Sequence, residues 1–266
     1  MQGLVRYLST LCYRLIVLGG LRPPARLYMR LSRRNFVPAV VDVPRAGTVL
    51  ILAPHMDDET IGCGGAILAH VAEGARVEVM YVTDGAEGFE RSEQAGTSKE
   101  QRCAIRRQES ERACALLGVS NSHYMNLPDG RSQPTATAVA ELVSLMDKLR
   151  PDVVYLPFFT DTHHDHRITN ELYCQAIKSG ASSAHILCCY EVWTPIYPNC
   201  IVDISAHMGT KMAALECYDS QLQMNNYLSS VKGLNAYRSI VNRSQGYAEA
   251  FYLTKPEDYM SLISDA

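Results

Sequence analysis

From residue 48 onward, short apolar runs alternate with longer stretches of helical period. Val49 to Ala53 is a continuous apolar run, as expected of a strand buried on both faces of a sheet. The Val-rich run 76–83 and the sequence DVVYLP at 152–157 predict two further buried strands, and shorter strands are expected at 123–127, 186–192 and 201–204. Helices are expected at 61–73, 99–117, 135–149, 168–179 and 211–218. This order predicts an α/β fold, a three-layer α/β/α, Rossmann-like domain with a mostly parallel sheet.

Two stretches lack such a pattern. Residues 84–96 are polar and contain Gly85, Gly88 and Gly96. They predict a loop in the place where α/β proteins keep lids over a bound ligand. From Ser229 onward no clear period is present until Tyr247 to Leu253.

The N-terminal segment differs from the rest in charge. Residues 1–41 hold seven arginines and no Asp, Glu or Lys, which leaves 18 basic and 28 acidic residues in the remainder. Residues 1–36 predict two short helical pieces, broken at Gly19-Gly20 and Pro23-Pro24. They are either an amphipathic arm that lies on an anionic membrane or a helix packed on the domain with its arginines in water. We predict a basic amphipathic arm at 1–40 and one main domain at 41–266.

Composition narrows the class of protein. The chain of 266 residues is 47% hydrophobic and 20% charged with a net charge of −3, which excludes a disordered chain and gives no sign of a nucleic-acid partner. Its nine cysteines are odd in number and form no C-x-x-C pair, which favours the reduced cytoplasm. No apolar stretch reaches the roughly 20 residues that span a bilayer. We predict a cytoplasmic protein, held at the cytoplasmic membrane face if the arm binds lipid.

Two polar clusters follow predicted strands, PHMDDE at 54–59 and DTHHDH at 161–166. In a parallel α/β sheet, ligands bind beyond the carboxyl ends of the strands. Burying so many ionisable groups is costly unless they pair or bind metal. A catalytic zinc has three N/O protein ligands and an open position for water, and His55, Asp58 and His166 can supply those three. Zinc lowers the pKa of water and polarises a carbonyl, so the clusters predict a metal-dependent hydrolase.

The same clusters resemble the two signatures of a known family. PHMDDE is similar to the [AP]-H-P-D-D-E motif of the PIG-L/LmbE-like zinc de-N-acetylases, and HHDH to their H-P-D-H motif. Further likeness in TDG at 83–85, RRQE at 106–109 and YAEAF at 247–251 extends the resemblance over about residues 47–253. The chain departs from the motifs at Met56 and His164, where the family has proline. Neither position is a ligand, so the departures concern loop geometry.

The resemblance implies a role for each matched residue. The metal ligands are His55, Asp58 and His166, the general base is Asp57, the residue that polarises or protonates the intermediate is His163, its orienting carboxylate is Asp165, and a substrate contact is Arg106. The cofactor is Zn²⁺, although Fe²⁺ or another divalent metal also suits two histidines and an aspartate. The substrate is an N-acetylated amino-sugar conjugate, either a lipid-linked glycan or a small N-acetylglucosamine conjugate.

Several residues keep two interpretations. Asp84 binds sugar hydroxyls or caps a turn, Glu59 orients a zinc-bound histidine or caps a helix, and Glu249 reaches the site or is structural. Gly62 to Gly65 either cradle a phosphate or permit close helix–strand packing.

Two other function classes remain as alternatives. One is a nucleotide-sugar or dinucleotide-binding Rossmann enzyme without metal, which would not explain His163 to His166. The other is a non-catalytic membrane module with a decayed metal site. That class would lack a ligand or the base, whereas all are present.

Overall fold

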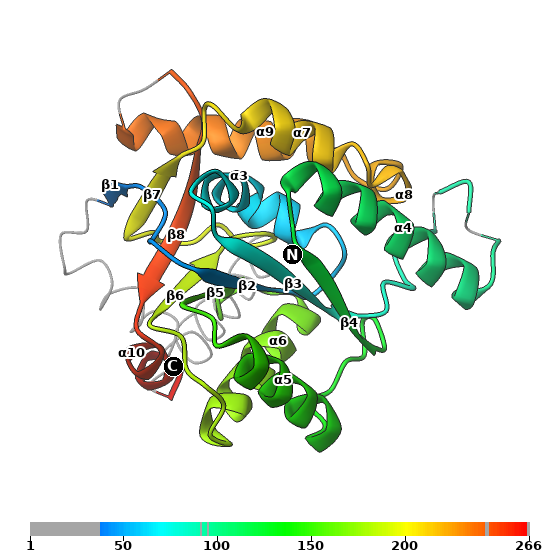
Figure 1. The fold of residues 1–266 in the computed structure, drawn as a ribbon. Coiled ribbons are helices and arrows are strands. Elements are labelled where there is room, and N and C mark those ends of the chain that lie inside the picture. Colours follow the sequence, from blue (N-terminus) through cyan, green and yellow to red (C-terminus); the bar gives the residue numbers. More distant parts are fainter. Residues whose placement is uncertain (1–37, 91, 95, 243–244, 265–266) are drawn as a thin grey trace, which may run out of the picture.

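An eight-stranded sheet forms the centre of the computed structural model, which describes residues 38–90, 92–94, 96–242 and 245–264 (Figure 1). In spatial order the strands are β1 (Ala39–Val41), β7 (Cys200–Asp203), β8 (Ala248–Thr254), β6 (Ile186–Tyr190), β5 (Val153–Pro157), β2 (Thr48–Ala53), β3 (Arg76–Thr83) and β4 (Asn121–Leu127). Strand β8 runs antiparallel to β6 and β7, and the other neighbouring strands are parallel.

Helices cover both faces of this sheet (Figure 1). One face carries α3 (Asp58–Ala72), α4 (Lys99–Leu117), α7 (Met208–Leu215), α8 (Asp219–Leu222) and α9 (Tyr227–Ser239), which is followed by the 3₁₀ turn η1 (Ile240–Asn242). The other face carries α5 (Ala136–Leu149), α6 (His164–Lys178) and α10 (Pro256–Ser264). The predicted three-layer α/β/α fold is confirmed.

Alternate residues of the central strands feed two separate hydrophobic cores. Val49 and Ile51 of β2 pack in the core beneath α3, together with Ile67. Leu50 and Leu52, which point to the opposite face, pack in the core shared with α5 and α6. Because successive side chains of a strand alternate between faces, a strand buried on both sides must be apolar at every position. This explains the unbroken apolar run from which β2 was predicted.

The strand order places two chain segments at one edge of the sheet. Strands β2, β3 and β4 lie successively in one direction, whereas the chain then returns to place β5 on the other side of β2. Parallel pairing aligns Val49 with Val153 and Ile51 with Tyr155, so β2 and β5 end together. The crevice outside such a reversal of strand order is where open α/β sheets bind their ligands. The segments that follow β2 and β5 are the two polar clusters.

Some elements differ from the prediction. Helix α3 begins at Asp58 rather than Ile61, and α6 begins at His164 rather than Ile168, so parts of both polar clusters form first helical turns. The helices α9 and α10 were not predicted. The buried positions of α9 include the polar residues Asn235 and Arg238, which bond to Ala248 and Glu191 on other segments. Because polar residues occupy buried positions, the helix shows no apolar period in the sequence.

The predicted arm lies mostly outside the described residues. Its last two positions, Ala39 and Val40, belong to the edge strand β1, which pairs with β7. Within the described part of the chain no helix is long and apolar enough to cross a bilayer. All eight cysteines that the structure describes are free thiols.

The glycines Gly62 and Gly65 permit close packing of α3 on its neighbours. A Cβ atom on Gly62 would lie 2.2 Å from the Tyr190 ring, and one on Gly65 would lie 2.4 Å from Ile204. Real Cβ contacts are longer, so these positions require glycine. The packing interpretation of residues 62–65 is confirmed, and no space is left there for a phosphate.

Helix α3 is kinked at Cys63, and a buried ion pair closes the break. Lys211 Nζ donates to the Ile61 carbonyl at 2.9 Å and lies 2.8 Å from the Glu249 carboxylate. The same carboxylate accepts hydrogen bonds from the backbone N–H groups of Gly65 and Ala66. Glu249 therefore has the structural role, because it satisfies the backbone donors that the kink exposes.

His70 near the end of α3 is buried and makes stability depend on pH. Its Nε2 atom lies 2.9 Å from the Tyr155 hydroxyl, and burial lowers the pKa of His70 to about 4. The unfolded histidine titrates near 6.5, so the unfolded chain binds more protons between these values and stability falls as the pH drops through them. The full difference corresponds to about 3 kcal/mol.

A His70→Gln variant tests this effect, since it keeps a polar group near Tyr155 but cannot titrate. Between about pH 7.5 and about pH 5, we expect the free energy of unfolding of the wild type to fall by about 2 kcal/mol more than that of the variant. Urea unfolding followed by circular dichroism measures both slopes. Equal pH dependence of the two proteins would contradict the assignment.

Candidate active site

The three predicted metal ligands meet at one carboxylate oxygen. His55 follows β2, Asp58 lies in the first turn of α3, and His166 lies in the first turn of α6. Asp58 Oδ2 is 3.1 Å from His55 Nδ1 and 3.2 Å from His166 Nε2. Ligand atoms that share a tetrahedral zinc at about 2.0–2.1 Å lie about 3.3 Å apart. Both contacts of Asp58 are close to that spacing.

His166 supplies a second indication of a metal. Its side chain is fully buried, and neither ring nitrogen has a hydrogen-bond partner of adequate geometry. A buried polar atom without a partner is costly, and coordination would satisfy Nε2. The ring nitrogens of His55, His163 and His166 also lie close enough together to hold one ion.

The electrostatics of the ligands are strongly coupled. Burial would raise the pKa of Asp58, but the imidazoles of His166 and His55 outweigh it and lower that pKa well below its usual range. Burial would lower the pKa of His166, but the Asp58 carboxylate outweighs it and raises that pKa to about 9. Without metal the two side chains therefore form an ion pair at neutral pH. A metal that binds here displaces the His166 proton.

Asp161 lies beside the second nitrogen of His166, a position that the sequence did not reveal. Its Oδ2 atom lies 3.4 Å from His166 Nδ1 and accepts a hydrogen bond from the backbone N–H of Trp193 at 3.0 Å. Oδ1 accepts from the backbone N–H of His163. A carboxylate behind a ligating histidine fixes its ring orientation and tautomer. The one available signal was the position of Asp161, at the start of the DTHHDH segment.

Asp165 and Asp129 lie behind His55. Asp165 Oδ2 is 3.0 Å from His55 Nε2 and 3.8 Å from His163 Nδ1, so its shorter contact is with the metal ligand rather than with the histidine that the resemblance paired it with. Asp129 Oδ1 is 3.2 Å from the same His55 nitrogen. The sequence predicted only a turn at residues 128–130 and missed this contact. The backbone N–H of Gly130 also donates a hydrogen bond to Asp165 Oδ2.

The predicted base, Asp57, sits in an unusual conformation beside an arginine. Its φ of 152° and ψ of −24° are rarely adopted by residues other than glycine, and such strain is found at functional sites. Burial raises the pKa of Asp57 to about 7, although Arg106 acts to lower it. Arg106 Nη2 lies 3.3 Å from Asp57 Oδ2, and Nη1 has no hydrogen-bond partner. Arg106 thus holds the predicted base, while its buried Nη1 atom lies 3.7 Å from Glu109 Oε2.

Glu59 supports the backbone of Asp57 instead of a zinc-bound histidine. Its carboxylate is fully buried and accepts hydrogen bonds from the backbone N–H of Asp57 and from the hydroxyls of Thr60 and Tyr218. Because the carboxylate is anchored on both sides, the turn that carries Asp57 and Asp58 has little freedom. Glu59 therefore fixes the backbone that carries the predicted base and one predicted ligand.

His163 faces the ligands from the start of α6. Its ring centroid lies 4.7 Å from that of His55 and 5.0 Å from that of His166. Burial and the two neighbouring imidazoles lower the pKa of His163. Its Nδ1 accepts the backbone N–H of Asp165 and caps the helix. The adjacent His164 turns away, and its Nε2 lies 3.0 Å from the Ser132 carbonyl.

These residues line a cavity of about 290 Å³ at the carboxyl edge of the sheet. Its walls include His55, Asp57, Asp58, Glu87, Arg106, Asp129, His163, Trp193 and Tyr227. Asp84 lines a neighbouring cavity with Met56 instead. The Asp84 carboxylate accepts the backbone N–H groups of Ala86 and Asp129 and pairs with Lys99 at 2.8 Å. Asp84 thus shapes the loop, and a direct sugar contact stays a prediction.

The described part of the 84–96 loop is tied to its surroundings. Arg102 donates to the Ala86 carbonyl, and the backbone N–H of Glu93 donates to Gln223 Oε1 at 2.9 Å. Gln221 donates to the Gly88 carbonyl. These contacts hold the loop beside the cavity, where Glu87 and Gly88 form part of the wall. That the loop closes over substrate stays a prediction.

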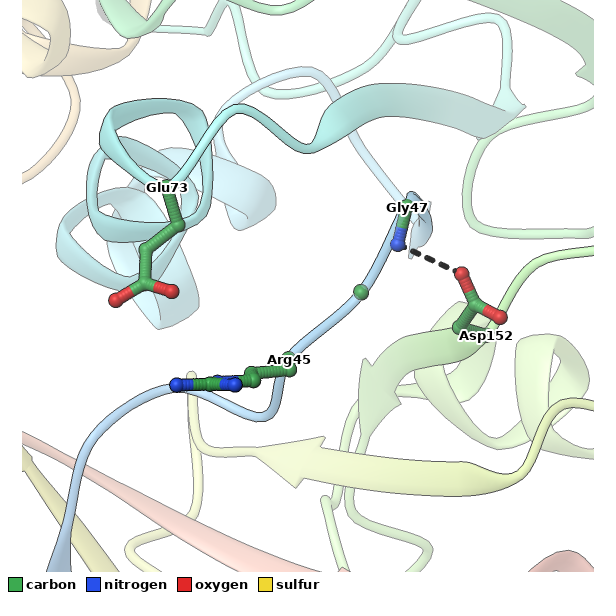
Figure 2. Close-up of a pocket in the computed structure, with 5 residues that line it drawn as sticks. Arg45, Gly47, Glu73 and Asp152 are labelled. Carbon is green, nitrogen blue, oxygen red and sulfur yellow. Dashed lines mark hydrogen bonds between the residues drawn. The ribbon is translucent and has the colours of Figure 1, made fainter.

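A second hollow lies beside the amino ends of β2 and β5, away from the histidines (Figure 2). Arg45, Glu73 and Asp152 line it. The Asp152 carboxylate accepts the backbone N–H groups of Gly47 and Thr48 at 2.8 and 3.0 Å, which lowers its pKa. The Asp152 carboxylate therefore links the amino ends of β2 and β5. Neither candidate metal-binding group of the described residues includes this hollow.

Comparison with known proteins decides which family carries this site. The protein-family model for PIG-L, the GlcNAc-PI de-N-acetylases, matches residues 50–177, which contain both polar clusters. The diacetylchitobiose deacetylase of Thermococcus kodakarensis is 30% identical over an alignment of 189 positions, gaps included, that covers 65% of this chain and 69% of that protein. The chain belongs to the PIG-L family. The family prediction and the predicted class of enzyme, an N-deacetylase, are confirmed.

Two further relatives extend the PIG-L comparison. The 1D-myo-inositol 2-acetamido-2-deoxy-alpha-D-glucopyranoside deacetylase of a Mycobacterium species is 27% identical over an alignment of 258 positions, gaps included, that covers 73% of this chain and 83% of that protein. The solved structure of N,N'-diacetylchitobiose deacetylase from Pyrococcus horikoshii matches with a TM-score of 0.73 at 24% identity, over 88% of this chain and 94% of that one. The structural match extends the shared fold beyond residue 177, where the match to the family model ends.

Proposed function

We propose that this chain hydrolyses the N-acetyl group of an amino-sugar conjugate with a zinc ion held by His55, Asp58 and His166. The observation that carries the proposal is the approach of both imidazoles to one oxygen of Asp58 at the carboxyl edge of the sheet. A set of two histidines and one carboxylate leaves an open position for water. Fe²⁺ also suits these donors, so the native metal is settled by elemental analysis.

Asp57 acts as the general base. When bound, the divalent metal supplies a water of lowered pKa and polarises the amide carbonyl. Asp57 follows the ligand His55 by two residues and lines the same cavity, so its carboxylate can take the proton of the attacking water. Arg106 holds the carboxylate in place from 3.3 Å, and Glu59 holds its backbone.

His163 and Arg106 act on the amide itself. The His163 ring lies beside both ligand imidazoles at the mouth of the cavity, where a protonated imidazole stabilises negative charge on oxygen and then passes its proton to the leaving amine. Arg106 lines the same cavity beside Asp57, so we expect its guanidinium to approach a sugar oxygen or the acetyl group. Asp165 and Asp129 keep His55 oriented, and Asp161 does the same for His166.

Acetate release from N-acetylated sugars tests the function. The zinc-loaded protein is incubated with N-acetylglucosamine, N,N'-diacetylchitobiose and the inositol and malate conjugates on which relatives are named as acting. We expect acetate and a free amine in equal amounts, loss of both after chelation, and recovery when zinc is restored. Absence of acetate from every sugar with metal-loaded protein would contradict the proposal.

The alternative of a nucleotide-binding enzyme has little support. The turn that follows β2 would have to accept a pyrophosphate against glycine backbone. Instead Gly62 and Gly65 face Tyr190 and Ile204 with no room for even a methyl group. The membrane arm at residues 1–36 and the cytoplasmic location stay predictions from the sequence, because the arm lies outside the described residues.

A further inference from the structure

An exposed tryptophan forms one wall of the catalytic cavity. Trp193 is the only tryptophan of the chain, and 50% of its surface is exposed. Its ring is inclined by 20° to that of His163, with centroids 6.2 Å apart, and Tyr227 meets it edge-on at 6.3 Å. A large aromatic surface left open beside a reaction centre is typical of a ligand contact.

The loop that carries Trp193 is fixed by buried charges. Asp161 accepts the backbone N–H groups of Trp193 and Thr194. Two residues earlier, the buried Glu191 accepts the backbone N–H of Ile196 at 2.9 Å and forms an ion pair with Arg238. The indole is therefore held in place before any ligand arrives, which lowers the entropic cost of binding against it.

The charges of the cavity limit what can bind there. Its walls carry the carboxylates of Asp57, Asp58, Glu87 and Asp129. Among the described lining residues, Arg106 is the one lysine or arginine, and it faces Asp57. A divalent metal offsets part of this negative charge at the reacting amide, but no other described residue that lines this cavity offers a cation to a phosphate or carboxylate elsewhere on the substrate. A negatively charged group of a ligand is repelled by these carboxylates when no cation lies beside it, and this weakens its binding.

We propose that Trp193 and Tyr227 bind a second, uncharged sugar ring next to the acetamido sugar, so that the preferred substrate is a neutral oligosaccharide. The inference rests on the proposed function and names its substrate class. A pyranose ring has a flat C–H face and hydroxyls at its edge, which suits an indole face inside a polar cavity. An anionic conjugate would meet Glu87 and Asp129 instead of a cation.

Because Trp193 is the sole tryptophan, protein fluorescence reports directly on this wall. The zinc-loaded Asp57→Asn variant, in which turnover is suppressed, is titrated with N,N'-diacetylchitobiose and with N-acetylglucosamine. We expect a saturable change in indole emission, with a Kd for the disaccharide about tenfold below that for the monosaccharide. Emission that stays constant up to on the order of 10 mM disaccharide would overturn the proposal.

Steady-state kinetics give a second measurement. In Trp193→Ala, we expect the ratio of kcat/KM for disaccharide to that for monosaccharide to fall about tenfold, and Trp193→Phe restores most of it. Tyr237→Ala is the matched control, because Tyr237 is 64% exposed and lies about 15 Å along α9 from Tyr227. A ratio unchanged by Trp193→Ala would overturn the proposal.

Substrate charge is varied separately. We expect kcat/KM for N-acetylglucosamine 1-phosphate to lie at least about tenfold below that for the neutral methyl glycoside of N-acetylglucosamine. The Glu87→Gln variant should reduce this difference in kcat/KM, because it removes one carboxylate from the cavity wall. Preference for the phosphate would overturn the proposal. Absence of acetate from every sugar would instead contradict the proposed function, and the fluorescence titration would still decide whether Trp193 binds a neutral sugar.

Discussion

Replacement of Asp57 by asparagine is expected to lower kcat by about 10²–10⁴-fold, because the carboxylate that accepts the proton of the attacking water is removed. Asparagine keeps the shape of the side chain, so we expect little disturbance of the unusual backbone at this position. We expect KM to change little and bound metal to be retained, since His55, Asp58 and His166 remain. Initial rates of acetate release and elemental analysis measure the two effects.

The matched control for this variant is Asp147→Asn. Asp147 lies on α5 and hydrogen-bonds the backbone and hydroxyl of Ser182 far from the cavity. The same chemical change there should leave kcat unaltered. If Asp57→Asn kept kcat within a few-fold of the wild type while binding metal normally, Asp57 would not be the base.

Replacement of His163 by asparagine is expected to lower kcat/KM by about 10²–10³-fold, the usual cost of losing a donor that stabilises developing negative charge. The His163 side chain also caps α6, and asparagine is a preferred capping residue, so the helix that carries His166 should keep its position. The expected loss is therefore catalytic rather than structural. Metal content and the thermal unfolding midpoint should match those of the wild type.

The neighbouring His164 provides the control for His163. Its ring contacts the Ser132 carbonyl instead of the ligands, so His164→Asn should retain most of the activity. An equal loss in both variants would mean that the segment 163–166 tolerates no substitution and that His163 has no special role. Comparison of the two variants distinguishes a specific role of His163 from a general sensitivity of the segment, because the two residues are adjacent and chemically identical.

Much of the fold and of the ligand cluster could be read from the sequence. Strands buried on both faces, such as Val49 to Ala53, leave an unbroken apolar run that shows both the strand and its place in a parallel sheet. Once the strands are placed, the end of each strand is placed as well, and His55 and His166 must then lie at one edge. The alternation of strands and helices along the chain, which predicts parallel strands, was enough for this prediction.

The positions that escaped prediction depend on contacts between distant segments. Asp129 looks like an ordinary turn residue, and only the fold brings it to 3.2 Å from His55. Helix α9 lacks an apolar period because Asn235 and Arg238 are buried against Ala248 and Glu191. Asp84 precedes a loop glycine, a pattern that left both a sugar contact and a turn cap open, and its carboxylate accepts backbone N–H groups and pairs with Lys99. Sequence pattern shows which residues are ionisable, but their partners follow from topology.

The most direct test of the metal site is elemental analysis of the purified protein beside two variants, His166→Ala and His164→Ala. His166 lies against Asp58, whereas His164 lies in the same turn and faces away. We expect about one zinc or iron per chain in the wild type and in His164→Ala, and almost none in His166→Ala, with acetate release lost in parallel. Wild-type protein that holds no metal after incubation with zinc, or a His166→Ala variant that binds it as tightly, would contradict a metal centre at His55, Asp58 and His166.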